Sequence, residues 1–305
     1  MDQFQGDLEK ITGEGTLKRG EPMSRHTTFQ IGGPAEFYLD VNTPAVLKKV
    51  LDIASRYRVP LFVFGGGSNI LVGDQGIKGL TVRFHSEEFV LKGKTLRVAA
   101  GMGLAKIAME MINRGLSTGL ENLATVPGTV GGAIYNNSHW QDKLLGDFLL
   151  KAEIYTPRQE VKEVPADYFR FAYDYSILRD SGDIVLTALF PVGKGVKEEM
   201  LKAVIANNQT RSLSQPLDTK CAGCTFRNPS KEQPAGKLIE QCGLKGKIIG
   251  GAKVSQKHAN FIINNGNASA FDVLKLIELC RREVRQKFGL DLKEEIFLVG
   301  EFAHD

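Results

Sequence analysis

The segment KCAGCTFRNP, residues 220–229, carries two thiols whose spacing could serve a metal ion, a redox pair or acid–base chemistry. Cys221 and Cys224 are separated by two residues. A structural zinc site usually takes four ligands, but Cys242 and Cys280 lie in expected helices and do not form a second pair. A thioredoxin-type pair would open a helix within a βαβ unit, which TFRNP does not resemble. The spacing therefore supports a metal or redox site only weakly, and small packing residues remain an alternative.

A run of glycines follows an apolar strand in FGGGSNILV, residues 64–72. Gly65, Gly66 and Gly67 leave the backbone N–H groups uncovered, and Ser68 and Asn69 add side-chain donors. Such a segment suits a pyrophosphate, whereas the ordinary alternative is a tight turn that needs positive φ. Neither G-x-G-x-x-G before a helix nor G-x-x-x-x-G-K-[ST] is present, so the sequence does not indicate a Rossmann site or a P-loop.

A second glycine-rich stretch, VPGTVGGAIYNN, is expected to form a loop over residues 127–137. Gly128, Gly131 and Gly132 alternate there with small or β-branched residues. A loop of this kind lets an extended ligand lie directly on the backbone. Two such loops favour one long dinucleotide that spans both. Two unrelated surface loops are the alternative, although the apolar neighbours of both segments argue against full exposure.

Length and composition exclude several classes of protein. The chain has 305 residues, 42% of them hydrophobic, and a net charge of +4 with acidic and basic residues interspersed. This length allows two domains, and a nucleic-acid binder would show a stronger basic cluster. The N-terminus lacks the apolar stretch of a signal peptide, and no apolar run reaches the length of a transmembrane helix. We expect a cytoplasmic protein with no nucleic-acid or membrane partner.

Hydrophobic periodicity predicts an α+β pattern of many short strands. Thr43 is expected to cap the first long helix, and Ser269 with Asp272 forms a capping box before the last one, which Gly289 ends. Helices are expected in 42–59, 104–115, 196–211, 237–243 and 269–289. A turn followed by a strand is expected in 31–41, and a strand that breaks at the glycines and resumes is expected in 60–72. Further strands are expected in 78–84, 94–101, 151–156, 184–190, 258–264 and 294–300.

Several segments together resemble one family of bacterial cell-wall enzymes, the UDP-N-acetylenolpyruvoylglucosamine reductases, or MurB family. They are TTFQIGGPAEFYLDV, FGGGSNILV, GLENLATVPGTVGGAIYNN, CAGCTFRNP, AGKLIEQCGLKGKIIGGAKVSQKHANFIIN and LKEEIFLVGE. They occur in this order from about residue 22 to residue 301, and they are most similar to the members with the shorter C-terminal domain.

The resemblance implies a two-lobed FAD-binding fold of the vanillyl-alcohol oxidase (PCMH) type and a C-terminal α+β substrate domain. The FAD-binding domain would span residues 1–195, with lobes of about 1–84 and 85–195, and the substrate domain would span 196–305. The cofactor-binding residues implied are Gly65, Gly66, Gly67, Ser68, Asn69, Ile70, Pro127, Gly128, Thr129, Gly131 and Gly132. His139 and Trp140, which follow the second glycine stretch, are candidates to cover the cofactor.

The resemblance also implies catalytic residues. Cys224 stands where the family usually has a serine that gives a proton to the substrate. A cysteine can do this, because its ordinary pKa of about 8.5 keeps most of it protonated at pH 7, and the thiolate left behind is more stable than an alkoxide. Glu295 matches the family's catalytic glutamate, although Glu294 is adjacent and either would more often be a solvated surface charge. His258 is given no catalytic role.

One motif departs from the family pattern of Tyr-Arg-x-Ser. The chain has Tyr173, Asp174, Tyr175 and Ser176, so a carboxylate stands where the resemblance implies an arginine that steadies developing negative charge. Tyr173 remains a catalytic candidate. Another cation would have to replace the arginine, and the candidates from the aligned motifs are Arg170, Arg179, Arg227 and Lys237.

The activity implied is reduction of the enolpyruvyl ether of UDP-N-acetylglucosamine to UDP-N-acetylmuramate, with NADPH as hydride donor and FAD as cofactor. Asn228 and Arg211 match positions near the nucleotide diphosphate, and we expect a monomer that binds a UDP-sugar. Two alternatives stay open. One is another flavoprotein oxidoreductase of the same fold, and the other, suggested by Asp174, is an FAD-binding homologue of low activity.

Overall fold

The computed structural model describes residues 2–302, which divide into two compact units. Unit 1 contains the described residues up to Arg19 together with Phe37–Gly66 and Gly79–Asn208. Unit 2 contains Gly20–Glu36, Gly67–Lys78 and the described residues from Gln209 onward. Each unit is therefore assembled from segments that are distant in the sequence, and each has its own hydrophobic core.

The largest sheet of unit 1 is antiparallel and has five strands in the order β12-β11-β13-β7-β6. Alternate residues of its central strands are buried, as in Ile154 and Ala188. The strands of this sheet are β6 (Phe89–Lys92), β7 (Thr95–Ala99), β11 (Lys151–Tyr155), β12 (Val161–Pro165) and β13 (Ile184–Pro191).

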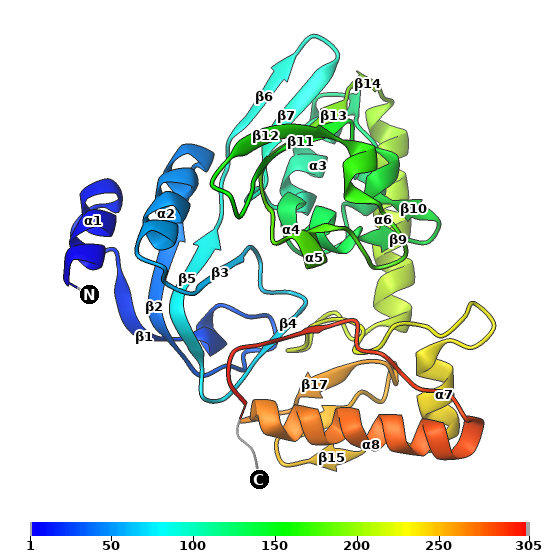
Figure 1. Cartoon of the computed structure of the whole chain (residues 1–305). Coiled ribbons are helices and arrows are strands. Elements are labelled where there is room, and N and C mark those ends of the chain that lie inside the picture. The colour runs from blue at the N-terminus through cyan, green and yellow to red at the C-terminus, as the bar shows by residue number, and fades with distance from the viewer. Residues whose placement is uncertain (1, 303–305) are drawn as a thin grey trace. The chain divides into compact units, whose positions relative to one another are not determined.

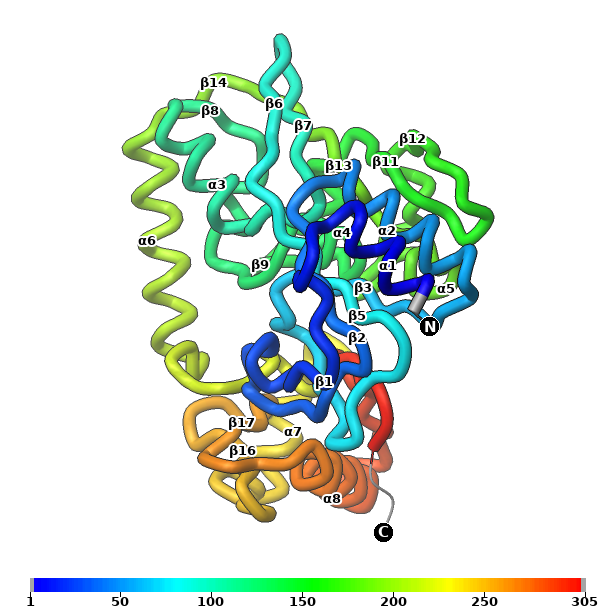
Figure 2. The backbone as a smooth tube through the Cα atoms, turned by 90° about the vertical axis from the view of Figure 1, so that its left-hand side faces the viewer, coloured from blue at the N-terminus to red at the C-terminus, as the bar shows by residue number. Residues whose placement is uncertain are grey.

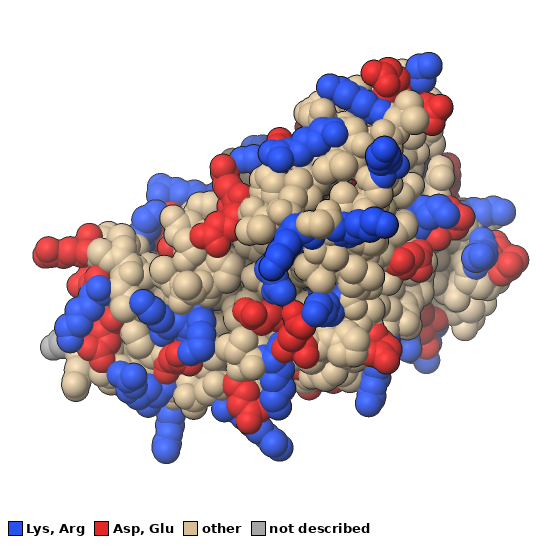
Figure 3. Space-filling view, turned by 90° about the horizontal axis from the view of Figure 1, so that it is seen from above, with Lys and Arg blue, Asp and Glu red and all other residues tan. Residues whose placement is uncertain are grey.

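Acidic and basic side chains are interspersed over the molecular face shown in Figure 3, which therefore presents no continuous basic stripe.

A second sheet has the strand order β1-β2-β5-β3, in which β3 and β5 are parallel. Smaller two-stranded pairs join β8 with β14 and β9 with β10. The strands of these sheets are β1 (Lys18–Pro22), β2 (Pro34–Val41), β3 (Leu61–Phe64), β5 (Ile77–Phe84), β8 (Leu116–Ser117), β9 (His139–Trp140), β10 (Lys143–Leu144) and β14 (Gly193–Lys194).

Helices α1 and α2 of unit 1 lie side by side (Figures 1 and 2). The predicted cap of α2 is confirmed, because Thr43 Oγ1 accepts a hydrogen bond from the Val46 N–H. The predicted apolar stripe packs into the core through residues such as Leu47 and Leu51. The helices that lie within or begin in unit 1 are α1 (Asp2–Thr12), α2 (Pro44–Arg56), α3 (Leu104–Asn113), α4 (Val130–Asn136), α5 (Leu178–Ser181) and α6 (Lys197–Ser214).

In unit 2, helix α8 lies along the antiparallel sheet β15-β16-β17 (Figure 1). The predicted capping box of Ser269 and Asp272 is present, and Gly289 ends α8 with φ +70°. The apolar face of α8, including Val273, Leu276 and Ile277, is buried in the core. The elements of unit 2 are β4 (Ile70–Val72), α7 (Ala235–Gln241), β15 (Ile248–Ile249), β16 (Ala252–Val254), β17 (Ile262–Asn264), α8 (Ala270–Phe288) and β18 (Phe297–Val299).

Two local expectations were wrong. The predicted loop over 127–137 contains the helix α4, which begins at Val130 because Thr129 Oγ1 caps it by accepting from the Gly132 N–H at 3.4 Å. The expected strand over 258–264 begins only at Ile262, because the Phe261 N–H bonds back to His258 O and closes a turn. Among the described helices, none is long and apolar enough to cross a bilayer.

Candidate active site

The two glycine stretches meet within unit 1, where the backbone of one packs on the other. A Cβ atom added at Gly65 would lie 2.2 Å from Thr129 Oγ1, and one added at Gly66 would lie 3.1 Å from the Cα of Gly128. Such approaches are possible only because these positions lack side chains. The two stretches thus come together in the part of them that belongs to unit 1, as one ligand spanning both would require.

Helix α4 begins at this point and turns its N-terminus toward the glycines. The Gly131 N–H donates to Ala100 O at 2.8 Å, which ties the helix start to the end of β7. Gly132 is exposed, and a Cβ there would meet only Thr129 Oγ1 at 3.5 Å. Side-chain-free backbone beside the positive end of a helix suits a pyrophosphate, so the residues present fit an FAD diphosphate. Pro127, just before this start, is exposed.

The remainder of the first glycine stretch belongs to unit 2 and holds the C-terminal segment. Gly67 has φ +63°, and a Cβ there would lie 2.3 Å from His26 O. Asn69 donates its side-chain N–H to Glu295 O at 3.3 Å, and Asn69 O accepts from the Phe297 N–H at 2.9 Å. Ile70 then opens β4, which pairs in parallel with β18. The structure therefore gives Asn69 a scaffolding contact that the sequence did not suggest, and Ser68 is half-buried beside it.

The segment that carries Cys224 is held by one buried asparagine. Asn260 is 2% exposed, and its side chain accepts from the Phe226 N–H at 2.9 Å and donates to Phe226 O at 2.7 Å. Its backbone oxygen accepts from the Thr225 N–H at 2.7 Å. The two residues after Cys224 are thereby fixed by three hydrogen bonds to a single residue. Sequence reasoning missed Asn260, because nothing in the string HANF predicts this pairing.

The Glu295 segment runs along the other edge of the same backbone. The Glu295 N–H donates to Thr225 O at 2.8 Å, and the Arg227 N–H donates to Lys293 O at 2.9 Å. Cys224 is thus the chain neighbour of the residue that bonds to Glu295. The structure therefore places the backbone segments that carry these two predicted residues next to each other.

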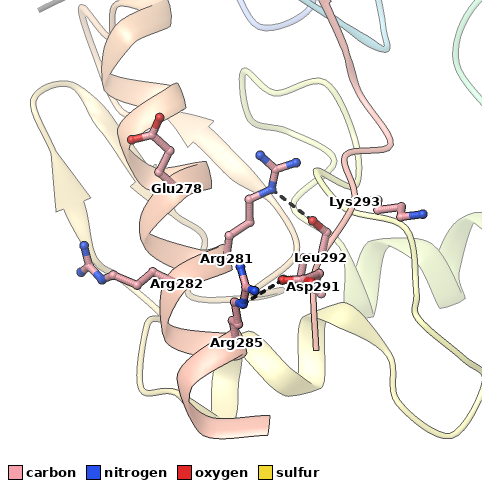
Figure 4. Close-up of a pocket in the computed structure, with 7 residues that line it drawn as sticks. All are labelled: Glu278, Arg281, Arg282, Arg285, Asp291, Leu292 and Lys293. Carbon is pink, nitrogen blue, oxygen red and sulfur yellow. Dashed lines mark hydrogen bonds and ion pairs between the residues drawn. The ribbon is translucent and has the colours of Figure 1, made fainter. Parts of the chain in front are cut away.

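Glu294, the competing carboxylate, has a structural partner. Arg281 of α8 pairs with the Glu294 carboxylate and donates its Nε–H to Leu292 O at 3.1 Å, as Figure 4 shows for Leu292. Arg285 pairs with Asp291 at 3.4 Å in the same cavity of ≈ 550 Å³. Through these contacts, Arg281 and Arg285 hold the chain segment that precedes Glu295. The side chain of Glu294 is therefore paired with α8.

Arg211, in the last turn of α6, is electrostatically linked to the thiols. It donates Nε–H and Nη2–H to Gln215 Oε1 at 3.1 and 3.0 Å. Burial lowers the pKa of Arg211, while the nearby thiols of Cys224 and Cys221 act in the opposite direction. A thiolate at Cys224 would therefore have a cation close by. None of the four cysteines forms a disulfide, and the described residues contain no cluster of three or more His, Cys, Asp or Glu placed for a metal.

Asn228 is exposed and has a local structural contact. Its Oδ1 accepts from the Ala235 N–H at 3.0 Å, at the first residue of α7. This bond satisfies one of the free donors at the helix start. Contact of Asn228 with a substrate stays a prediction.

Tyr173 and Asp174 lie in a tight turn of unit 1 with opposite environments. Tyr173 is 47% exposed, whereas Asp174 is 1% exposed and adopts φ +49°. Mutual backbone hydrogen bonds between Ala172 and Tyr175 close the turn. The side chain placed beside the Asp174 carboxylate is His139, whose Nδ1 lies 3.4 Å from Asp174 Oδ1. Arg179, one of the expected replacement cations, donates to Asn136 Oδ1.

Known proteins match the chain over nearly its whole length. Residues 35–164 match the FAD-binding domain model, and residues 215–299 match the model of the UDP-N-acetylenolpyruvoylglucosamine reductase C-terminal domain. The reductase of Caldanaerobacter subterraneus is 40% identical over 96% of this chain and 97% of its own length. That of Bacillus subtilis is 35% identical over 96% of this chain and 99% of its own length.

The crystal structure of the reductase (MurB) from Thermus caldophilus superposes with a TM-score of 0.79 at 34% identity. It covers 93% of this chain and 98% of its own length. The predicted α+β fold with an FAD-binding domain and a C-terminal domain is confirmed. On these matches the chain belongs to the UDP-N-acetylenolpyruvoylglucosamine reductase (MurB) family.

Proposed function

We propose that the protein reduces UDP-N-acetyl-3-O-(1-carboxyvinyl)-glucosamine to UDP-N-acetylmuramate, with FAD as cofactor and NADPH as hydride donor. The observation that carries the proposal is the pairing of the Cys224 and Glu295 segments through the Thr225–Glu295 hydrogen bond. This bond joins the backbone next to Cys224 to the backbone of Glu295, which supports a shared role for the two residues in a chain whose relatives bear the reductase name.

The FAD diphosphate would be held by the backbone at Gly65, Gly66, Gly128 and the start of α4. The close approach of these residues supports this assignment, since any side chain at Gly65 would displace Thr129. Bound FAD would supply the hydride transfer between NADPH and the terminal alkene carbon of the substrate. The chain itself must bind and orient the reactants and handle the proton.

Cys224 is proposed to give its thiol proton to the carbon next to the substrate carboxylate. Addition of a hydride to the terminal carbon and of this proton to its neighbour converts the C=C bond into a lactyl ether and leaves a thiolate at Sγ. The charge of Arg211 would stabilise that thiolate, in keeping with the electrostatic link between the two side chains. Solvent water then returns a proton to the sulfur.

Glu295 is proposed to steady the substrate carboxylate in its enol-like form as charge develops. Its backbone is fixed by Thr225 and Asn69, so its position relative to the Cys224 segment is determined by hydrogen bonds rather than by a mobile loop. Tyr173, exposed on its turn, is proposed to contact substrate. Asn228 and Arg211 are proposed to lie near the nucleotide diphosphate.

A two-stage experiment tests the function. Purified protein, loaded with FAD if necessary, is reduced anaerobically with NADPH and then mixed with the enolpyruvyl sugar nucleotide. We expect the flavin absorbance near 450 nm to bleach and then return with formation of UDP-N-acetylmuramate. Reoxidation by small alcohols or by oxygen alone, with no sugar-nucleotide product, would contradict the proposal.

Asp174 favours a second candidate, an FAD-binding homologue of low activity. Its buried carboxylate has the wrong sign for a group that stabilises negative charge. The same experiment separates the two, because this homologue would bleach with NADPH and fail to recover with the sugar nucleotide.

We also propose that the reaction serves peptidoglycan synthesis in the cytoplasm, and with it cell shape and division, and that the enzyme is a monomer. The UDP-sugar substrate class named for the relatives supports the first part. Light scattering coupled to size exclusion tests the second. A mass near 33.5 kDa is expected, and twice that mass would refute the monomer.

A further inference from the structure

The carboxylate of Asp174 is buried without a hydrogen bond. Asp174 is 1% exposed, and neither of its carboxylate oxygens accepts a hydrogen bond from the described residues. A carboxylate taken out of water is costly unless a donor or cation lies beside it. The proposed mechanism does not use this group, so its burial requires its own explanation.

The imidazole of His139 lies beside this carboxylate and can account for its burial. Nδ1 of His139 lies 3.4 Å from Asp174 Oδ1, within ion-pair range. A carboxylate only accepts hydrogen bonds, so the facing Nδ1 must carry a proton for the two side chains to pair. The His139 side chain is 26% exposed and its ring lies 5.0 Å from the Tyr173 ring. Nε2 is therefore the nitrogen left to meet a bound molecule.

The scaffold holds both partners through one buried residue, Asn137. Its side chain donates to Ala172 O at 2.9 Å, at the start of the Asp174 turn, and accepts from the Gly146 N–H at 3.0 Å. Asn137 is 2% exposed and precedes His139 by two positions. Beyond the turn, Ser176 Oγ donates to Tyr135 O at 2.7 Å. The pair thus rests on a satisfied polar framework and is not an incidental surface contact.

This framework is attached to the proposed cofactor loop. Asn137 is the C-cap of α4, and the N-terminus of the same helix lies at Thr129 in the glycine stretch. A helix of seven residues rises about 10 Å. The His139–Asp174 pair and the glycine stretch are thus the two ends of one short element of unit 1.

We propose that Asp174 is a positioning residue for His139 and that His139, as the imidazolium with a proton on each ring nitrogen, binds the substrate carboxylate through Nε2–H. This inference rests on the proposed function, in which the anionic enolpyruvyl group gains charge density as hydride arrives and needs a donor. The pair would supply that donor in place of an arginine at position 174. The proposed pair explains both the burial of the Asp174 carboxylate and the position of His139 beside it.

The kinetic test compares His139→Gln, Asp174→Asn and the double variant. Each single change should lower kcat/KM for the enolpyruvyl substrate about 10- to 100-fold, the scale of one lost hydrogen bond to a charged group. The loss should fall mainly on the rate at which that substrate reoxidises the reduced flavin, because the donor acts as charge develops, and NADPH should still reduce the flavin at the wild-type rate. The double variant should be no worse than the poorer single one, because the residues act as a unit.

A matched control is His85→Gln, which removes the exposed histidine that lies 3.9 Å from Asp40 and should leave every constant unchanged. Three results would overturn the proposal: wild-type kinetics in His139→Gln, losses that multiply in the double variant, or flavin reduction that falls as much as turnover.

A spectroscopic readout separates this inference from the proposed function. In ¹⁵N-histidine-labelled holoenzyme, His139→Gln identifies the His139 ring signals, and Asp174→Asn should shift them while leaving those of His85 in place. Addition of UDP-N-acetylmuramate should move the Nε2 signal. If the wild-type enzyme fails to turn over but Asp174→Asn still shifts His139, the pair stands and the proposed function fails. Ring signals that Asp174→Asn leaves unchanged would refute the pair itself.

Discussion

The turn at residues 172–175 and the segment at residues 224–226 both present a candidate reactive side chain, but the structure holds them differently. At 224–226 the backbone is bonded on both edges, by Asn260 and by the Glu295 segment. At 172–175 the backbone is also anchored, yet the side chain of Asp174 is buried with no hydrogen bond.

The difference separates two ways of preparing a site. At 224–226, the hydrogen-bonded backbone fixes the position of Cys224. The reactivity of its thiol therefore depends on where the backbone places the side chain. At 172–175, a buried carboxylate lies beside a histidine, and the electrostatic interaction between them prepares the site. Surroundings of low polarity strengthen this interaction. The 224–226 segment should therefore respond most to changes in hydrogen bonding, and the turn should respond most to changes in charge.

A large effect is expected at Glu295, whose backbone N–H bonds to the 224–226 segment. Glu295→Gln should lower kcat about 100-fold, the scale of one positioned acid–base group, with little change in unfolding. Glu294→Gln is the matched control, because its amide oxygen still accepts from Arg281. Steady-state NADPH oxidation with the enolpyruvyl sugar nucleotide measures both. The reverse ranking would show that the neighbouring glutamate is the functional one.

Removal of the bracing amide tests whether hydrogen bonding dominates at 224–226. Asn260→Ala leaves the Phe226 N–H and C=O without their side-chain partner. We expect the free energy of unfolding to fall by about 2–4 kcal/mol and kcat to fall with it, as measured by denaturant titration and steady-state assay. Asn265→Ala, at an exposed position, should do neither. A fully stable and active Asn260→Ala would remove the contrast between the two regions.

The assignment of the glycine stretches to FAD is tested at the N-terminal end of α4, away from the 172–175 turn. Gly65→Ala places a methyl group against Thr129, where overpacking costs about 1–3 kcal/mol. The FAD dissociation constant should rise about tenfold, as followed by flavin fluorescence. Gly6→Ala, where a Cβ meets nothing within 4 Å, is the control. Unchanged FAD affinity in Gly65→Ala would separate the glycine stretch from the cofactor.

The smallest expected effect is on the pH dependence of stability, through a histidine that contacts Asn260, the residue that holds the 224–226 segment. His258 Nδ1 accepts from the Asn260 N–H, and burial, helped by the charge of Lys245, lowers the pKa of His258. Unfolded histidine has a pKa of about 6.5, so below this pH the unfolded chain takes up a proton that the folded protein resists. Stability should therefore fall as pH drops from 7 to 5, by at most about 1.4 kcal/mol per unit for this group.

His258→Gln should flatten that part of the stability curve, and His85→Gln should not. Thermal or denaturant unfolding at several pH values makes the comparison. An identical pH dependence in wild type and His258→Gln would show that protonation of His258 is not coupled to the stability of the protein.

Much of the fold is predictable from local patterns. The caps at Thr43, Ser269 and Gly289 and the apolar faces of α2 and α8 follow from short-range rules, and the structure contains them. The glycine stretches favour one dinucleotide that spans both, and the structure brings Gly65 and Gly66 against Thr129 and Gly128. Helix α4 was missed because glycines at 131 and 132 disfavour a helix, and the Thr129 cap and tertiary contacts override that preference.

The candidate site is less predictable, because its supporting contacts are long-range. Asn260 and Phe226, or Asn137 and Ala172, are far apart in the chain, and no periodic pattern connects them. The sequence shows that Asp174 departs from the family motif but not that His139 lies beside it. The interleaving of the two units, in which 20–36 and 67–78 join the C-terminal residues, likewise depends on strand pairing at a distance.

The central claim is that the Cys224 thiol supplies the proton and takes no part in flavin reduction. Stopped-flow measurement of the two half-reactions in Cys224→Ala tests it directly, with Cys224→Ser and Cys221→Ala alongside. We expect NADPH to reduce the flavin of Cys224→Ala at the wild-type rate, while the reduced enzyme is not reoxidised by the enolpyruvyl sugar nucleotide. Cys224→Ser should retain substantial activity and Cys221→Ala should resemble wild type. Normal reoxidation in Cys224→Ala, or loss of its flavin reduction in folded protein, would contradict the account.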